Sequence, residues 1–267
     1  CMIMRERASQ KRVDEAIADL ESDSVAVRKK AVEFFAAEDS FYAREQLAIL
    51  YLWGEYKEFP GGPGIFEALV ASGPGVVEPL VTISRWDRAE RLTAEVKRPP
   101  ESRNQSRESL VTALVARLGA AASGELVKLL SHGDENVRAD AARLLGKTGD
   151  PTVVPILNSL LNGEEPELRN AAIESFGDLG FVGAVPALAE LLINGDDRND
   201  KRVAGRALGR IGTPQAQSAL IDGASAPDML TRSTSVRALA LSSNALPGRA
   251  FEPLAAAAEE TDINLRR

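Results

Sequence analysis

The sequence contains very few of the side chains on which most metal sites and many active sites depend. Among its 267 residues are one cysteine, Cys1, and one histidine, His132. A single cysteine excludes a disulfide within the chain. One histidine and one terminal cysteine also exclude most zinc sites and the Cys-His and Ser-His-Asp catalytic arrangements. We therefore expect no catalytic residue, no metal site and no cofactor, and we interpret His132 as a solvent-facing turn residue.

The chain also lacks a long apolar run and an excess of basic residues. No uninterrupted apolar stretch approaches 18 residues, which predicts no membrane insertion. The net charge is −7, with both signs spread along the sequence, and this argues against nucleic-acid binding, which needs a basic face. We expect a soluble, cytoplasmic protein. A lipid anchor on Cys1 is a minor alternative, because mature bacterial lipoproteins begin with cysteine.

Internal repetition is the strongest feature of the sequence. Residues 137–146 (VRADAARLLG) match residues 168–177 (LRNAAIESFG) at an offset of 31 residues. A period of this size is typical of a solenoid of helix pairs, because one short pair cannot bury its apolar stripes alone. Four glycines mark the register where each first helix ends and a positive φ is often needed. They are Gly119, Gly149, Gly180 and Gly212, at intervals of 30, 31 and 32 residues.

The motif VRxxAAxxLGxxGDPxxVPxL of the first unit resembles HEAT-like repeats of the type named after phycobilisome lyases. The second unit keeps LRxAA, FGxLG and VPxL. The resemblance implies an all-α fold, a right-handed α-solenoid of about seven antiparallel helix pairs. We expect irregular repeats over residues 1–103, a regular core over 104–222 and capping helices over 223–267. The motif is specific for this fold, but such repeats serve many unrelated functions.

Arginines recur at the openings of the predicted first helices. Arg138 and Arg169 are the clear cases, and Val27-Arg28 resembles a worn copy of the same opening. We interpret Arg138 and Arg169 as structural, forming a ladder of ion pairs and carbonyl contacts between repeats, because the planar guanidinium forms several bonds at once. A role in ligand binding is the alternative.

The N-terminal third differs in composition, since ten of the thirteen aromatic residues lie between residues 34 and 86. One interpretation is that irregular repeats need bulky core residues. The other is an aromatic groove for a partner, with a basic rim from the arginine-rich segment 85–107. The alternative interpretation of segment 85–107 is a solvated insertion between two repeats. The groove hypothesis uses eight residues: Tyr42, Tyr51, Trp53, Tyr56 and Trp86, with Arg85, Arg88 and Arg91 at the rim.

Together these patterns favour a non-enzymatic scaffold that binds another protein. Its concave, second-helix face has outward positions at Lys128, Asn158 and Glu190, and the aromatic third is a further contact. The family resemblance also implies an alternative, a bilin lyase or bilin-handling chaperone that acts on a phycobiliprotein subunit and holds a linear tetrapyrrole. HEAT-repeat hydroxylases of the deoxyhypusine type are excluded, because they need several His-Glu pairs. The sequence predicts no particular oligomeric state.

Overall fold

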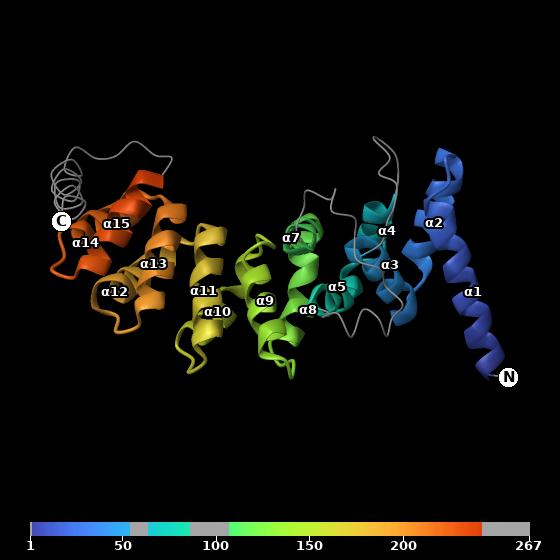
Figure 1. The fold of residues 1–267 in the computed structure, drawn as a ribbon, viewed down its shortest axis with the longest axis horizontal. Helices are drawn as coiled ribbons and strands as arrows, with labels where there is room; N and C mark the ends of the chain where they lie inside the picture. The colour runs from blue at the N-terminus through green and yellow to red at the C-terminus, as the bar shows by residue number, and fades with distance from the viewer. Residues whose placement is uncertain (1, 54–63, 86–106, 242–267) are drawn as a thin grey trace, which may run out of the picture. The chain divides into compact units, whose positions relative to one another are not determined.

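The computed structural model describes residues 2–53, 64–85 and 107–241. These residues form helices and turns without a strand, so the predicted all-α solenoid of helix pairs is confirmed for them (Figure 1). The chain divides into two compact units, unit 1 over Cys1–Ala141 and unit 2 over Ala142–Arg267, and the boundary falls within helix α9. This division follows contacts, whereas the three predicted segments follow the regularity of the sequence.

Unit 1 is an array of short helices packed against near neighbours. Its elements are α1 (Met2–Leu20), α2 (Val25–Ala37), α3 (Phe41–Trp53), α4 (Ile65–Ala71), the 3-10 turn η1 (Pro74–Val76), α5 (Val77–Ser84), α7 (Arg107–Leu118), η2 (Gly119–Ala122), α8 (Ser123–Leu129) and the start of α9 (Glu135–Leu145). Helix α1 packs against α2, α2 against α4, α3 against α5, and α5 against α7. Large apolar side chains such as Phe35, Leu47 and Leu80 are fully buried between them.

Unit 2 repeats one arrangement of a first helix, a short 3-10 or capped turn, and a second helix. Its elements after α9 are η3 (Pro151–Val153), α10 (Val154–Leu161), α11 (Pro166–Leu179), η4 (Val182–Ala184), α12 (Val185–Asn194), α13 (Arg198–Ile211), α14 (Pro214–Ala224) and α15 (Met229–Leu241). The first helices stack in the order α11, α13, α15, and the second helices α12 and α14 also contact each other (Figure 1). The apolar faces of both helices in each pair are thereby buried, as the repeat period predicts.

Small residues allow the first helices of unit 2 to approach closely. Ala142, Ala171 and Ala204 are fully buried. Just after α9, a Cβ added to Gly146 would lie only 2.5 Å from the Cα of Ser175 in α11. The hydroxyl of Ser175 donates to the carbonyl of Ala142 at 2.7 Å across the same interface. This position therefore has no room for a side chain, which explains why glycine ends the repeated helix motif.

The predicted register glycines all adopt the left-handed conformation. Their φ angles are 58° at Gly119, 68° at Gly149, 63° at Gly180 and 63° at Gly212. A residue with a Cβ is strained there, so glycine ends each first helix and turns the chain into the second. The prediction that these four glycines mark the register of the repeats is confirmed, and each lies in the turn between the first and second helices of a pair.

Two helix starts are capped by aspartates, Asp134 and Asp150, as the preference for aspartate at N-cap positions predicts from the sequence. The side chain of Asp134 accepts from the backbone N–H of Asn136 at 2.8 Å, before α9. Asp150 accepts from Thr152 at 2.9 Å, with Pro151 at the first position of η3. Each carboxylate satisfies an N–H group that would otherwise lack a partner in the first turn. Hydrogen bonds from the backbone of Asn136 hold the pKa of Asp134 below its ordinary value.

One stretch within the described residues, Arg107–Leu129, is long and apolar enough to cross a membrane by length and composition. The stretch is not an uninterrupted apolar run, because Arg117 and Glu125 lie within it. The stretch is folded as α7, the turn η2 and α8, and Leu114, Val115 and Leu126 are fully buried in unit 1. Core helices pass the same test, so it is weak evidence for a membrane.

Candidate partner-binding surfaces

Four arginines make the same contact at the start of a first helix, and we call this contact the carbonyl clamp. In each, Nη1 donates to the backbone carbonyl six residues earlier. The pairs are Arg28 to Ser22 at 2.7 Å, Arg138 to His132 at 3.0 Å, Arg169 to Gly163 at 3.1 Å and Arg232 to Ala226 at 3.0 Å. The clamp satisfies loop carbonyls, so it fixes the chain just before each helix.

These contacts confirm the structural interpretation of Arg138 and Arg169. Arg169 also donates from Nε to Asp200 in the next first helix, at 2.7 Å. The carboxylate side chain of Asp200 is only 6% exposed, so the pair is a buried link between α11 and α13. The clamp at Arg232 was not predicted from the sequence. Arg232 lies 31 residues after Lys201, so the repeat register could have identified Arg232 as a clamp residue.

Lys201 replaces the clamp arginine in α13 and binds differently. Its ammonium donates to the carbonyl of Ile193 at 3.1 Å, to Asp228 at 3.2 Å and to the hydroxyl of Thr231 at 3.0 Å. An ammonium has three N–H donors, so all of them are in use. The Thr231 hydroxyl and the Lys201 ammonium hold the pKa of Asp228 well below its ordinary value. Lys201 therefore links α13 to α15 and has no donor left for a ligand.

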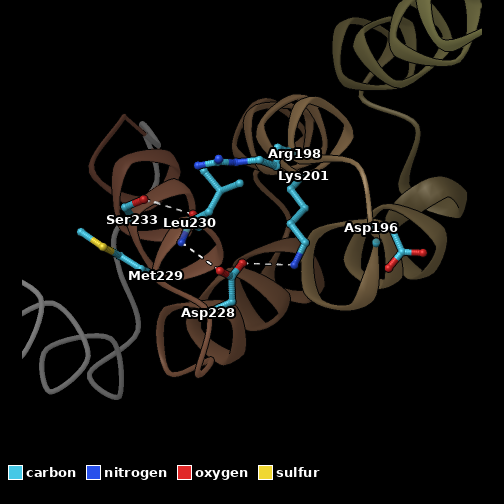
Figure 2. A pocket seen from close by; sticks show the side chains of 8 residues that line it. Asp196, Arg198, Lys201, Asp228, Met229, Leu230 and Ser233 are labelled. Carbon is cyan, nitrogen blue, oxygen red and sulfur yellow. Dashed lines mark hydrogen bonds and ion pairs between the residues drawn. The ribbon is translucent and has the colours of Figure 1, made fainter.

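An open pocket of about 590 Å³ lies beside Lys201, within unit 2 (Figure 2). Its lining residues are Gly195, Asp196, Arg198, Lys201, Asp228, Met229, Leu230 and Ser233. Figure 2 shows Lys201 reaching down to Asp228, while Arg198 extends beside Leu230. Met229 is 60% exposed. Lys201 and Asp228 of this lining are engaged in structural contacts, and Arg198 is an exposed cation beside them.

Two rows of ion pairs cross the outer faces of the first helices in unit 2, and we call them the charge ladder. In one row, Glu174 of α11 accepts from Arg143 at 3.1 Å and from Arg206 at 3.2 Å. In the other, Asp178 of α11 pairs with Lys147 at 2.8 Å and with Arg210 at 3.1 Å. Each carboxylate therefore bridges two cations, one from α9 or the turn that follows it and one from α13.

The predicted positions on the second helices are exposed. Lys128 of α8, in unit 1, pairs with Glu125 at 2.8 Å along its own helix. In unit 2, Asn158 of α10 and Glu190 of α12 are exposed and lie 32 residues apart. Asp222 of α14 is exposed at the next interval of 32 residues. We call Asn158, Glu190 and Asp222 the second-helix row. The sequence prediction missed Asp222, although the register indicates it.

The aromatic groove is corrected at Tyr51, which was predicted to be exposed. Tyr51 is 4% exposed and its ring lies 6.1 Å from the ring of Phe66, so it belongs to the core. Tyr42 is partly exposed, and its hydroxyl donates to Asp14 at 3.2 Å. Trp53 ends α3, and its side chain lies outside the described part. Irregular repeats do use bulky core residues here, as the alternative interpretation held.

The predicted basic rim is described only at Arg85. This arginine is exposed and forms a bidentate ion pair with Asp140 of α9, within unit 1. The hydrogen bond with Asp140 raises the pKa of Arg85 above its ordinary value. Its guanidinium is therefore already paired. Four further predicted residues lie outside the described residues: Tyr56, Trp86, Arg88 and Arg91.

His132 lies in the turn before α9, as predicted. It is partly exposed, and its Nδ1 accepts from the backbone N–H of Asp134 at 3.1 Å. Within residues 2–53, 64–85 and 107–241, no group of three or more His, Cys, Asp or Glu side chains is placed to hold a metal ion.

A family model described as HEAT repeats matches residues 123–199 and 185–267, which together are more than half of the chain. The chain belongs to the HEAT-repeat family. This confirms the resemblance that the VRxxAA motif indicated and extends it past residue 222, to a region where the sequence motif is faint. No curated protein matches the chain.

Several solved structures are similar to the chain at low sequence identity. An engineered protein is 19% identical, with a TM-score of 0.43, over 93% of this chain and 67% of its own. Human deoxyhypusine hydroxylase is 16% identical, with a TM-score of 0.39, over 89% and 98%. The CpcE–CpcF complex of phycocyanin lyase from Nostoc is 19% identical, with a TM-score of 0.41, over 92% and 94%. Similarities at this level carry no conclusion about activity.

Proposed function

We propose that the protein is a non-enzymatic scaffold that binds a partner protein along its second helices. The observation that supports this most directly is the second-helix row of Asn158, Glu190 and Asp222. The row places exposed polar side chains at one position of three successive pairs, so it offers repeated contacts to an extended partner. A solenoid commonly uses such a face for binding, because its inner sides are occupied by packing between repeats.

The first helices differ from the second helices in how their charges are used. Glu174 and Asp178 are engaged in the charge ladder on both sides. By contrast, the contact described for the Glu190 carboxylate is with Asn194 of its own helix, at 3.0 Å. A partner can displace such a local contact without breaking a link between helices. This favours the second helices over the first as the scaffold's contact with an extended partner.

The aromatic third is a secondary part of this proposal. Tyr51 is core, which leaves Tyr42 as the partly exposed aromatic residue of the proposed groove within the described residues. Its hydroxyl is held by Asp14, so its ring edge is the available contact. We therefore centre the proposed interface on the second-helix row instead of on the aromatic residues.

Site-specific photo-crosslinking tests the scaffold proposal. A photoreactive benzoylphenylalanine at position 190 is compared with the same residue at position 167, where Glu167 is exposed on the first helix α11. We expect one protein to crosslink at 190 and at 222, and its purified form to bind the full chain. Binding should weaken in the Glu190→Lys, Asp222→Lys variant. Equal crosslinking at 167 and 190, or unchanged affinity of the variant, would contradict the proposal.

The same purified chain tests the bilin lyase alternative. It is incubated with a linear tetrapyrrole and an unmodified phycobiliprotein subunit, and covalent attachment is followed by absorbance and mass spectrometry. Under the scaffold proposal no attachment above the uncatalysed rate is expected. Accelerated attachment would show that the protein is an enzyme.

A further inference from the structure

The charge ladder follows a fixed spacing rule. Where α9 meets α11, Gly146 faces Ser175, 29 residues apart, and the ladder pair Arg143–Glu174 has a spacing of 31. Where α11 meets α13, Gly177 faces Ala207, 30 residues apart, and an added Cβ would lie 2.8 Å from the Ala207 Cα. The ladder pair Glu174–Arg206 there has a spacing of 32. In both interfaces the ladder spacing exceeds the contact spacing by two residues.

The same rule applied to α13 and α15 brings two arginines together. Gly209 faces Ala238 at a spacing of 29 residues, and an added Cβ would lie 3.2 Å from the Ala238 carbonyl oxygen. A ladder spacing of 31 therefore places Arg206 beside Arg237. Both side chains are exposed. The row thus runs Arg143, Glu174, Arg206, Arg237, and its last step joins like charges where the earlier steps join opposite ones.

This end of the ladder has too few carboxylates for its cations. The two rows contain five cationic side chains, Arg143, Lys147, Arg206, Arg210 and Arg237, and two carboxylates, Glu174 and Asp178. Arg202 is also exposed, one turn before Arg206 on α13. Each of the two carboxylates already bridges two cations. Among the described residues, the ladder rows on α13 and α15 are therefore locally positive, in a chain whose net charge is −7.

We propose that the face formed by Arg202, Arg206, Arg210 and Arg237 binds an acidic segment of a partner protein. A carboxylate of that segment lies between Arg206 and Arg237, in the same way as Glu174 lies between Arg143 and Arg206. Arginine binds carboxylates through paired, charge-assisted hydrogen bonds, and the ladder shows this pairing at the same spacing. This face lies on the first helices, so the inference stands apart from the second-helix proposal.

An acidic peptide fits this face better than a nucleic acid does. Four arginines on two helices form a short patch, whereas sequence-independent nucleic-acid binding relies on many phosphate contacts along an extended basic surface. The overall negative charge of the chain repels a long polyanion but disfavours a short acidic segment much less at physiological ionic strength, because exposed charges are screened beyond about 8 Å.

Fluorescence anisotropy with the full chain tests this inference. The probe is a fluorescein-labelled decapeptide of alternating glutamate and glycine, and the glutamine version of the peptide is the control ligand. In the variant Arg237→Glu the new carboxylate pairs with Arg206 and completes the ladder. We expect the acidic peptide to bind the variant at least about tenfold more weakly, with an unchanged or raised Tm. Arg237→Gln, which removes the charge without completing the ladder, should show an intermediate loss.

The matched control is Arg117→Glu, an exposed arginine on α7 of unit 1. It changes the net charge by the same amount and should leave peptide affinity within about twofold of wild type. Equal losses in the two variants would show a net-charge effect and overturn the proposal, as would failure of the wild type to bind at low salt. Tighter, Arg237-dependent binding of a single-stranded oligonucleotide would show that the class of partner is wrong. Crosslinking at position 190 reports separately on the second-helix row.

Discussion

The two units solve the same packing problem with different side chains. In unit 2, alanines and glycines bring the first helices close together, and the exposed charges fall into rows at the repeat spacing. In unit 1, Phe35 and Tyr51 fill the core, and polar contacts such as Tyr42–Asp14 and Arg44–Asp39 are isolated pairs. Close approach therefore makes the surface regular as well as the core, because equal helix spacing brings equivalent side chains into contact.

The largest expected effect on stability comes from truncating a large core side chain in unit 2, the regular unit. Phe176 is fully buried and its ring stacks on Phe181, with centroids 5.8 Å apart. We expect Phe176→Ala to lower the free energy of unfolding by about 3–5 kcal/mol, because tightly packed repeats cannot collapse onto the cavity. Urea denaturation measures the loss. The control is Phe41→Ala in unit 1, where the side chain is 55% exposed and the change should be about 0.5 kcal/mol or less.

Adding one methyl group at the close approach tests why unit 2 is regular. In Gly146→Ala the new Cβ meets the backbone of Ser175, so the helices must move apart, at a cost of about 1–3 kcal/mol. In Gly133→Ala the new Cβ meets nothing within 4 Å, and stability should hold or rise slightly. Thermal denaturation compares the two variants. Equal melting temperatures would mean that close approach does not limit this interface.

The carbonyl clamp occurs in both units. Variants of one clamp arginine from each unit therefore distinguish the effect of the clamp from the effect of the Arg169–Asp200 ion pair between repeats. We expect Arg169→Ala to cost about 1–3 kcal/mol, because it breaks the clamp and leaves the Asp200 carboxylate buried without its guanidinium. Arg28→Ala in unit 1 loses bonds to the carbonyls of Ser22 and Asp23, and should cost about 1 kcal/mol. Urea midpoints measure both losses. An unchanged stability of Arg169→Ala together with loss of partner binding would reverse the structural assignment.

The smallest effect concerns the cap that joins α13 and α15. Asp228 accepts from the backbone N–H of Thr231 at 3.1 Å and from Lys201, so Asp228→Ala should cost about 1 kcal/mol. Its folded-state pKa lies below the unfolded value. The stabilisation is therefore complete above the ordinary aspartate pKa of about 3.9 and is lost as the pH falls below it.

Urea midpoints at about pH 6 and about pH 3 check the sign of this effect. The wild type should lose more stability on acidification than Asp228→Asn, which cannot titrate at this position. Asp222→Asn is the matched control, because Asp222 is exposed in the same unit. An equal loss in the wild type and in Asp228→Asn would remove Asp228 as a source of the pH dependence.

The sequence predicted the parts of the fold that depend on local chemistry. The four register glycines, the caps at Asp134 and Asp150 and the structural use of Arg169 all follow from the needs of helix ends. The burial of Tyr51 did not follow, because an aromatic residue on an irregular helix suits a core and a groove equally well. The Arg85–Asp140 pair could not be predicted either, since it joins residues separated by 55 positions with no shared motif.

By itself, then, the sequence determined that this chain is an array of helix pairs and where each regular pair begins and ends, because helix starts, stops and periodicity are encoded within a few residues of each other. Only the tertiary structure decided which charges meet. Glu174 lies between Arg143 and Arg206 because the glycine and alanine contacts set the stagger of the helices. The same stagger, extended to α13 and α15, is the basis on which we place Arg237 beside Arg206, and a stagger is a property of packed neighbours that no single repeat contains.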